Sequence, residues 1–229
     1  IMRDGIVLRA DVYRPDTGGR WPVILMRFVM NPNDEVEELG AYFARHGYAF
    51  VYNDVRGCAR SDGEFFPMVD EAWGENQDGY DTVEWAGSQS WSNGNVGTSY
   101  GAFNQYTTAP TRPPSLKASM PFYGSNIRET VFPNGIYRLE EHRGWALWMA
   151  LNCLENQVAS EHQDRVRARL QAAQQDHEAW IWHLPITECA QLEGGSAWHF
   201  EHLQHCTDLE WWAKTDARAK LTEIDVPML

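Results

Sequence analysis

Basic residues are scarce in this chain: 19 lysines and arginines against 32 aspartates and glutamates leave a formal net charge of −13. Nucleic-acid backbones and anionic membranes attract proteins with a basic face, so the sequence predicts neither as a main partner. Long apolar runs are also missing, since a stretch such as residues 23–26 is far shorter than the ~20 residues that span a bilayer. The 43% hydrophobic content is nevertheless ordinary for a globular chain of 229 residues. These numbers predict a soluble protein.

Cysteine is sparse as well, and no C-x-x-C pair occurs. The four cysteines are widely spaced: Cys58, Cys153, Cys189 and Cys206. Such spacing predicts mostly free thiols rather than a disulfide framework. Tryptophan, by contrast, is abundant, and eleven of these large rigid side chains are expected to pack an insertion or to line a pocket.

Both ends of the sequence resemble interior segments. The chain starts at Ile1 as if already entering a strand, and it ends on an apolar run, residues 224–229, where a strand should begin. We therefore expect it to be a piece of a longer polypeptide.

The first half alternates strand and helix signals. Strands are expected at 6–13, 22–26, 48–52, 96–98 and 116–122, and helices at 36–45, 78–86 and 100–109, with a tight turn at Asn93-Gly94. Strands that alternate with helices predict βαβ units and a parallel sheet. After about residue 125 the sequence becomes helix-like, at 140–158 and 161–177, before an apolar run resumes near Ile224. The pattern is typical of an α/β sheet interrupted by a helical insertion.

Residues 97–101 read G-T-S-Y-G, a G-x-S-x-G sequence between a short predicted strand and a helix. A nucleophile elbow needs small residues around the serine because the strand-to-helix turn is very sharp. Such a turn would expose the hydroxyl of Ser99 and aim the backbone N–H of Tyr100 at a developing oxyanion. An ordinary glycine-rich turn would fit the pattern alone about as well.

Further motifs stand in order along the chain. Residues 54–57 (DVRG) and 61–65 (SDGEF) resemble the D-x-R-G-x-x-x-S-x-G-E-[FW] signature of the cocaine esterase and X-Pro dipeptidyl-peptidase family, the CocE/NonD-like serine hydrolases. Residues 81–85 (DTVEW) and 89–97 (QSWSNGNVG) look like its next stretch, and residues 2–15 resemble its entry strand. The resemblance is dense over 1–125 and thin across the insertion.

The resemblance implies an α/β-hydrolase fold with an inserted helical cap and a sheet that is incomplete at the C-terminus. The corresponding divisions are 1–125 for the first part of the hydrolase domain, 126–220 for the cap and 221–229 for the returning strand. It further implies hydrolysis of esters or amides through an acyl-enzyme on Ser99, with the histidine and aspartate of the triad outside this chain. The implied partner is a small-molecule ester or amide, with no cofactor and no metal, and a homo-oligomer is left open.

Two departures from the family pattern support a second hypothesis. Val96-Gly97 runs straight into Thr98-Ser99, about three residues sooner than usual, which predicts a shortened central strand. The tyrosine that donates to the oxyanion in the family falls here on Met30 or Asn33, and only the asparagine could donate. A non-catalytic remnant that acts as a binding module would show both features.

Other candidate sites are interpreted as structural. His199, His202 and His205 precede Cys206 in an H-x-x-H-x-x-H-C pattern, which with Cys189 could hold zinc, but a solvated or cap-facing helix is the favoured interpretation. A carboxylate-rich acid/base site could be formed by Asp54, Arg56, Asp62 and Glu64, but the favoured interpretation is that Arg56 and its acidic neighbours brace the loop beside the elbow. Five tryptophans are expected in the core or at a domain interface rather than in a substrate cage, although a minority could line an acyl pocket: Trp180, Trp182, Trp198, Trp211 and Trp212.

Overall fold

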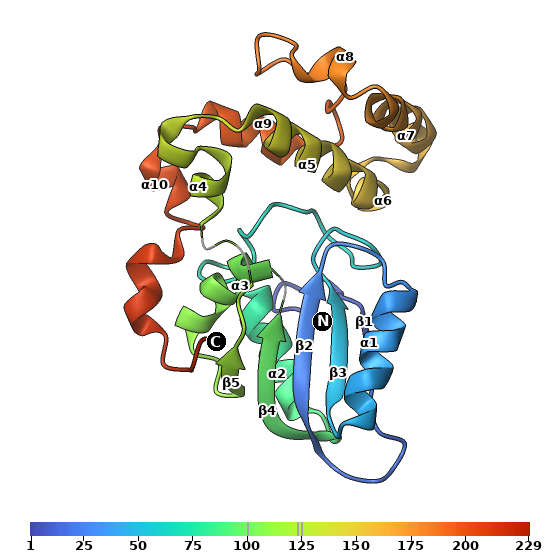
Figure 1. The fold of residues 1–229 in the computed structure, drawn as a ribbon, viewed down its shortest axis with the longest axis vertical. Helices are drawn as coiled ribbons and strands as arrows, with labels where there is room; N and C mark the ends of the chain where they lie inside the picture. Colours follow the sequence, from blue (N-terminus) through green and yellow to red (C-terminus); the bar gives the residue numbers. More distant parts are fainter. Residues whose placement is uncertain (100, 123, 125) are drawn as a thin grey trace.

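A computed structural model describes residues 1–99, 101–122, 124 and 126–229 of the chain. Its centre is a five-stranded sheet in the order β1-β3-β2-β4-β5, in which β1 runs antiparallel to β3 and the other pairs are parallel (Figure 1). The strands are β1 Ala10–Tyr13, β2 Trp21–Phe28, β3 Ala49–Asp54, β4 Ser92–Ser99 and β5 Leu116–Ser119. This arrangement is the predicted α/β class with a mostly parallel sheet.

Helices cover both faces of the sheet. On one face α2 (Asp78–Ser88) buries Val83 and Ala86 against Val23 and Leu25 of β2. On the other face α1 (Asp34–Arg45) stacks Phe43 on Phe50 of β3, with ring centroids 5.6 Å apart. Because both faces are covered, β3 is buried along its whole length, as the continuous apolar sequence of residues 48–52 predicts.

The predicted helix at 36–45 is confirmed, and its ends follow from the sequence. Asn33 caps the N-terminus, since its side chain accepts a hydrogen bond from the N–H of Val36 at 3.2 Å. Gly47 follows the C-terminal cap at φ +81°, a conformation that favours glycine. The predicted helices at 78–86 and 100–109 are found as α2 and α3 (Gly101–Thr108).

The expected strand at 96–98 is confirmed but is longer than predicted, and the expected turn at Asn93-Gly94 is wrong because both residues belong to the strand. The strand β4 has eight residues and starts at Ser92. Between the pairs Trp21↔Ser92 and Val23↔Val96 its register shifts, so that it carries a bulge. Gly94 lies in this bulge at φ +86°. The earlier start of β4 leaves the short spacing between Val96-Gly97 and Ser99 unchanged, so the argument for a non-catalytic remnant stays a prediction.

Two strands, in contrast to β4, are shorter than predicted. The expected strand at 6–13 pairs with β3 only from Ala10, and the strand expected at 116–122 ends at Ser119. Near the end of the sequence Met228 forms an isolated parallel bridge with Ser119, and the N–H of Leu229 donates to the Ser119 carbonyl at 2.9 Å.

A layer of helices lies beyond the carboxyl ends of the parallel strands (Figure 1). We call it the helical layer; it comprises α4 Ile127–Val131, α5 Leu139–Asn152, α6 Leu154–Gln157, α7 Ser160–Gln175, α8 Glu178–Ile181, α9 Ala197–Gln204 and α10 Leu209–Trp212. Short 3₁₀ turns complete the chain: η1 Ala109–Thr111, η2 Pro133–Gly135 and η3 Ala217–Glu223. Within the described part of the chain, no helix is long and apolar enough to cross a membrane.

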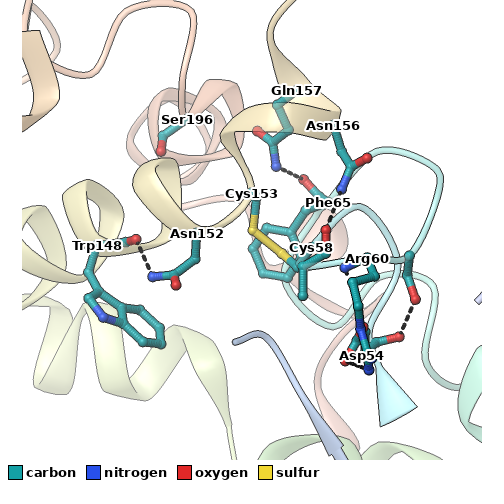
Figure 2. Close-up of a disulfide and its surroundings, with 12 residues drawn as sticks. Asp54, Cys58, Arg60, Phe65, Trp148, Asn152, Cys153, Asn156, Gln157 and Ser196 are labelled. Carbon is teal, nitrogen blue, oxygen red and sulfur yellow. Dashed lines mark hydrogen bonds and ion pairs between the residues drawn. A yellow bond between two sulfur atoms is a disulfide. The ribbon is translucent and has the colours of Figure 1, made fainter. Parts of the chain in front are cut away.

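The expectation of mostly free cysteines is wrong for two of the four. Cys58, in the loop after β3, forms a disulfide with Cys153, at the junction of α5 and α6 (Figure 2). Sequence spacing could not reveal this pair, because 95 positions separate two residues whose Cα atoms lie 4.3 Å apart. Cys189 and Cys206 are free thiols.

Candidate functional site

The serine that the sequence predicts as nucleophile lies at the end of a strand that precedes a helix. Ser99 is the last residue of β4, and α3 begins at Gly101, so the G-x-S-x-G sequence joins a strand to a helix. In the sheet Ser99 pairs with Met26 of β2, near the carboxyl ends of the parallel strands. Tyr100, predicted to supply the oxyanion N–H, lies outside the described residues. The catalytic roles of both residues remain predictions.

An apolar pocket of about 340 Å³ opens beside this edge of the sheet. Phe28 lies in its wall at the end of β2, two residues beyond Met26, and Phe103 lies in it from the first turn of α3. The remaining lining comes from the loops after β2 and β3 and from the helical layer: Val29, Met68, Ile127, Thr130, Val131, Glu141, His142, Trp145 and Trp148. A mostly apolar cavity with a few polar groups is typical of a small-molecule site.

The tryptophans of this pocket are not those singled out from the sequence. Trp145 and Trp148 line the pocket from α5. Of the five tryptophans expected in the core, Trp180, Trp198 and Trp212 are buried, whereas Trp182 is 68% exposed. The signal that could have identified the pair was its spacing of three residues on a predicted helix, which places both side chains on one face.

His142 is a pocket residue that the sequence analysis missed. Its Nε2 lies 3.4 Å from Nδ1 of His202, and its ring stacks against that of His199 at 5.1 Å between centroids. Burial, together with the neighbouring His199 and His202, lowers the pKa of His142 well below 6.5. A neutral imidazole therefore faces the pocket, where it can exchange hydrogen bonds without introducing charge.

The three histidines of the H-x-x-H-x-x-H pattern do not lie in one environment. His199 and His202 are buried in α9, whereas His205 stacks on Trp211 and its Nδ1 lies 3.3 Å from a carboxylate oxygen of Asp208. Burial lowers the pKa of both His199 and His202 to about 3. Across residues 1–99, 101–122, 124 and 126–229, no group of three or more His, Cys, Asp or Glu side chains is arranged to hold a metal ion. The histidines of α9 are core residues.

The two residues at the family's tyrosine position have other roles. Met30 is held through its backbone, because the hydroxyl of Tyr52 donates to its carbonyl at 2.9 Å. The side-chain oxygen of Asn33 caps α1. Burial raises the pKa of Tyr52, so this phenol remains a hydrogen-bond donor.

The arginine of the motif braces the loop after β3, but through partners distant in sequence. The Nε and Nη2 of Arg56 donate to the buried carboxylate of Asp78 at 2.8 and 2.7 Å, and its Nη1 donates to Asp4 at 2.6 Å. The carboxylate of Asp54 instead accepts hydrogen bonds from the guanidinium of Arg60. The expected bracing by Asp62 and Glu64 is wrong, since neither carboxylate is bound to Arg56; that arginine ties the loop to the start of α2.

A second buried pair holds the same loop to the sheet. Arg27 of β2 donates through Nη1 to Glu71 and through Nε to Asn53 at 2.9 Å. Burial raises the pKa of Glu71 to about 7, against the opposing effect of Arg27. These ties fix the floor of the pocket, which includes Met68 from this loop.

His46 lies at the wrong edge of the sheet to serve Ser99. It caps the C-terminus of α1, three residues before the start of β3, and its Nδ1 lies 2.7 Å from the carbonyl oxygen of Tyr42. Ser99 is at the end of its strand, at the opposite edge. His46 is therefore a structural residue of the α1 terminus.

Comparison with known proteins gives concordant results. The cocaine esterase of Rhodococcus sp. (strain MB1 Bresler) is 34% identical over 177 residues, which cover 71% of this chain and 30% of that protein. A CocE/NonD family hydrolase from Staphylococcus aureus superposes with a TM-score of 0.67 at 23% identity, over 99% of this chain and 38% of that one. An α-amino acid ester hydrolase gives a TM-score of 0.63 at 20% identity, over 99% and 40%.

These two solved structures share the fold of the chain, and the chain spans about a third of the length of the relatives it matches. The family model for X-Pro dipeptidyl-peptidases of the S15 family matches residues 4–229. The chain therefore belongs to the X-Pro dipeptidyl-peptidase (S15) family.

Proposed function

We propose that this chain supplies the nucleophile and the acyl-side pocket of a serine hydrolase that cleaves ester or amide bonds. The observation that carries the proposal is the placement of the G-x-S-x-G sequence between β4 and α3, at the edge of the sheet beside the apolar pocket. Membership of the S15 family and the similarity to a cocaine esterase support the same reaction class.

In the proposed reaction the hydroxyl of Ser99 attacks the substrate carbonyl while a base takes its proton. The backbone N–H of Tyr100 donates to the oxyanion of the tetrahedral intermediate. The intermediate collapses to an acyl-enzyme as the alcohol or amine leaves with that proton. Water then attacks the acyl carbon, and Ser99 is released with a carboxylate product.

The base and its orienting acid are expected from a segment outside these residues. The histidine in the pocket wall, His142, has a pKa well below 6.5 and is engaged with His202. Such a group would be a weak base at neutral pH, because the best general bases have a pKa near the working pH.

A fluorophosphonate probe tests the proposal, with intact mass as the readout. In the longer natural polypeptide we expect one adduct, which is lost in Ser99→Ala and retained in Ser88→Ala, an exposed serine at the end of α2. In the 229-residue chain alone we expect no adduct. An adduct that persists in Ser99→Ala would refute the assignment of the nucleophile.

A further inference from the structure

The disulfide joins the two layers of the molecule at the end where no backbone connects them. The first and last helices of the helical layer, α4 and α10, lie at the same end of that layer (Figure 1). They are tied to each other, since Asn126 Nδ2 donates to Asp216 Oδ1 at 2.6 Å. Cys153 lies at the other end, between α5 and α6, and bonds to Cys58 of the loop after β3.

The other polar ties at this end are weak. Asn156 donates to the Ala59 carbonyl at 3.4 Å and Gln157 to the Phe65 carbonyl at 3.5 Å, as Figure 2 shows around the disulfide. Both donors belong to α6, a helix of only four residues. Hydrogen bonds at the long limit of the distance range contribute little to stability.

Apolar packing between the layers is extensive, but it does not fix their register. One buried cluster unites Val55, Phe65 and Met68 from the sheet side with Leu147 and Leu154 from the helical layer. The hydrophobic effect is non-directional, so such a cluster tolerates small sliding of one layer over the other. A covalent bond does not tolerate such sliding. The disulfide therefore sets the distance between α5–α6 and the loop after β3.

That distance also shapes the apolar pocket. Its lining includes Met68, from the loop that contains Cys58, and Trp145 and Trp148 of α5, the helix whose C-terminal cap is Cys153. A displacement of the α5–α6 end would move one wall of the pocket away from the other.

We propose that Cys58–Cys153 is a dithiol-responsive latch: its reduction frees the α5–α6 end of the helical layer and widens the pocket beneath it. Because Cys58 and Cys153 are buried, the α5–α6 end first opens locally; a thiolate of the dithiol then attacks one sulfur, the S–S bond breaks, and a mixed disulfide forms. The second thiol of the reagent then closes a cyclic disulfide. Two electrons and two protons pass to the protein, which gains two thiols. The predicted effect on catalysis rests on the proposed function; the structural effect does not.

The test uses the longer natural polypeptide, with dithiothreitol as the dithiol and hydrogen exchange followed by mass spectrometry. Alkylation and intact mass report how far Cys58 and Cys153 are reduced in native buffer. We expect amides in residues 149–157 to exchange at least tenfold faster after reduction, while those of α1 and β3 stay unchanged. Hydrolysis of a 4-nitrophenyl ester should fall at least tenfold in the same samples.

Matched variants separate the latch from other thiols. Cys153→Ala should exchange like the reduced protein and no longer respond to dithiothreitol, whereas Cys206→Ser, which removes a half-buried free thiol, should behave like the parent. If Cys153→Ala does not fold, the reduced parent protein still provides the comparison.

Three outcomes would overturn the latch: a disulfide that stays oxidised in native buffer, full reduction with unchanged exchange in 149–157, or faster exchange throughout the sheet. Unchanged exchange would mean that the bond does not hold the α5–α6 end in place, and faster exchange throughout the sheet would mean that it stabilises the whole fold. Absence of ester hydrolysis in both redox states would count against the proposed function alone, since the exchange measurement needs no substrate.

Discussion

Acidification should destabilise this protein through its buried histidines. His142, His199 and His202 lie together in the helical layer, and the cations nearest to them are Arg143 and Lys214, which further disfavour a charged imidazole. The folded chain therefore keeps these rings neutral, whereas the unfolded chain protonates them below about pH 6.5. Stability is fully present above that pH and is lost progressively as the pH falls toward the folded-state values.

The magnitude follows from the two pKa values of about 3. A pH of 5 lies about 1.5 units below the ordinary histidine pKa, so each histidine is protonated in the unfolded chain but stays neutral in the folded one. This difference lowers the free energy of unfolding by about 2 kcal/mol per residue. His199 and His202 together remove about 4 kcal/mol, and His142 adds to the loss. Glu71 acts in the opposite direction, because a raised carboxyl pKa makes the folded chain take up a proton between about pH 7 and pH 4.5.

Urea unfolding at pH 5 and pH 7.5, followed by tryptophan fluorescence, measures this loss. Comparing variants cancels the contribution of Glu71. His199→Phe replaces a ring whose two nitrogens have no hydrogen-bond partner among the described residues. At pH 7.5 we therefore expect little change in the free energy of unfolding, and at pH 5 a loss that is smaller than the parent's by about 2 kcal/mol. His162→Gln, on the exposed side of α7, should keep the parent's pH dependence. Equal pH dependence in His199→Phe and the parent would refute the reasoning.

Two further predictions concern stability and use the same unfolding measurement. Asp78→Asn should cost about 3–5 kcal/mol by leaving the Arg56 guanidinium buried without its bidentate partner. Its control is Asp81→Asn, which removes the more exposed pair with Arg3 and should cost less than about 1 kcal/mol; equal losses would show that burial does not matter here. Gly57→Ala should lower the free energy of unfolding several times more than Gly47→Ala, for which we expect a loss of about 1 kcal/mol. Both glycines have a positive φ, but a Cβ at Gly57 would lie 2.2 Å from the Phe65 nitrogen, whereas a Cβ at Gly47 would have no described atom within 4 Å.

The comparison of expectation with structure shows where local sequence is sufficient. The helix from Asp34 to Arg45 was predictable because its caps, Asn33 and Gly47, act within a few residues. The buried strand β3 was predictable because its continuous apolar run has few alternatives. The strand β4 was misread, since Asn93-Gly94 is a strong turn signal and only pairing with β2 absorbs it as a bulge.

For the candidate site, the sequence by itself determined the serine motif, its place between a strand and a helix, and the family. Only the tertiary structure decided the pocket, the disulfide and the partners of Arg56. Trp145 and Trp148 meet Phe28 only when α5 lies over the sheet, and Cys58 meets Cys153 in the same event. Each of these contacts joins residues tens of positions apart. The local signals that specify turns, caps and strands act over a few residues, so long-range contacts of this kind are decided by packing of the whole chain.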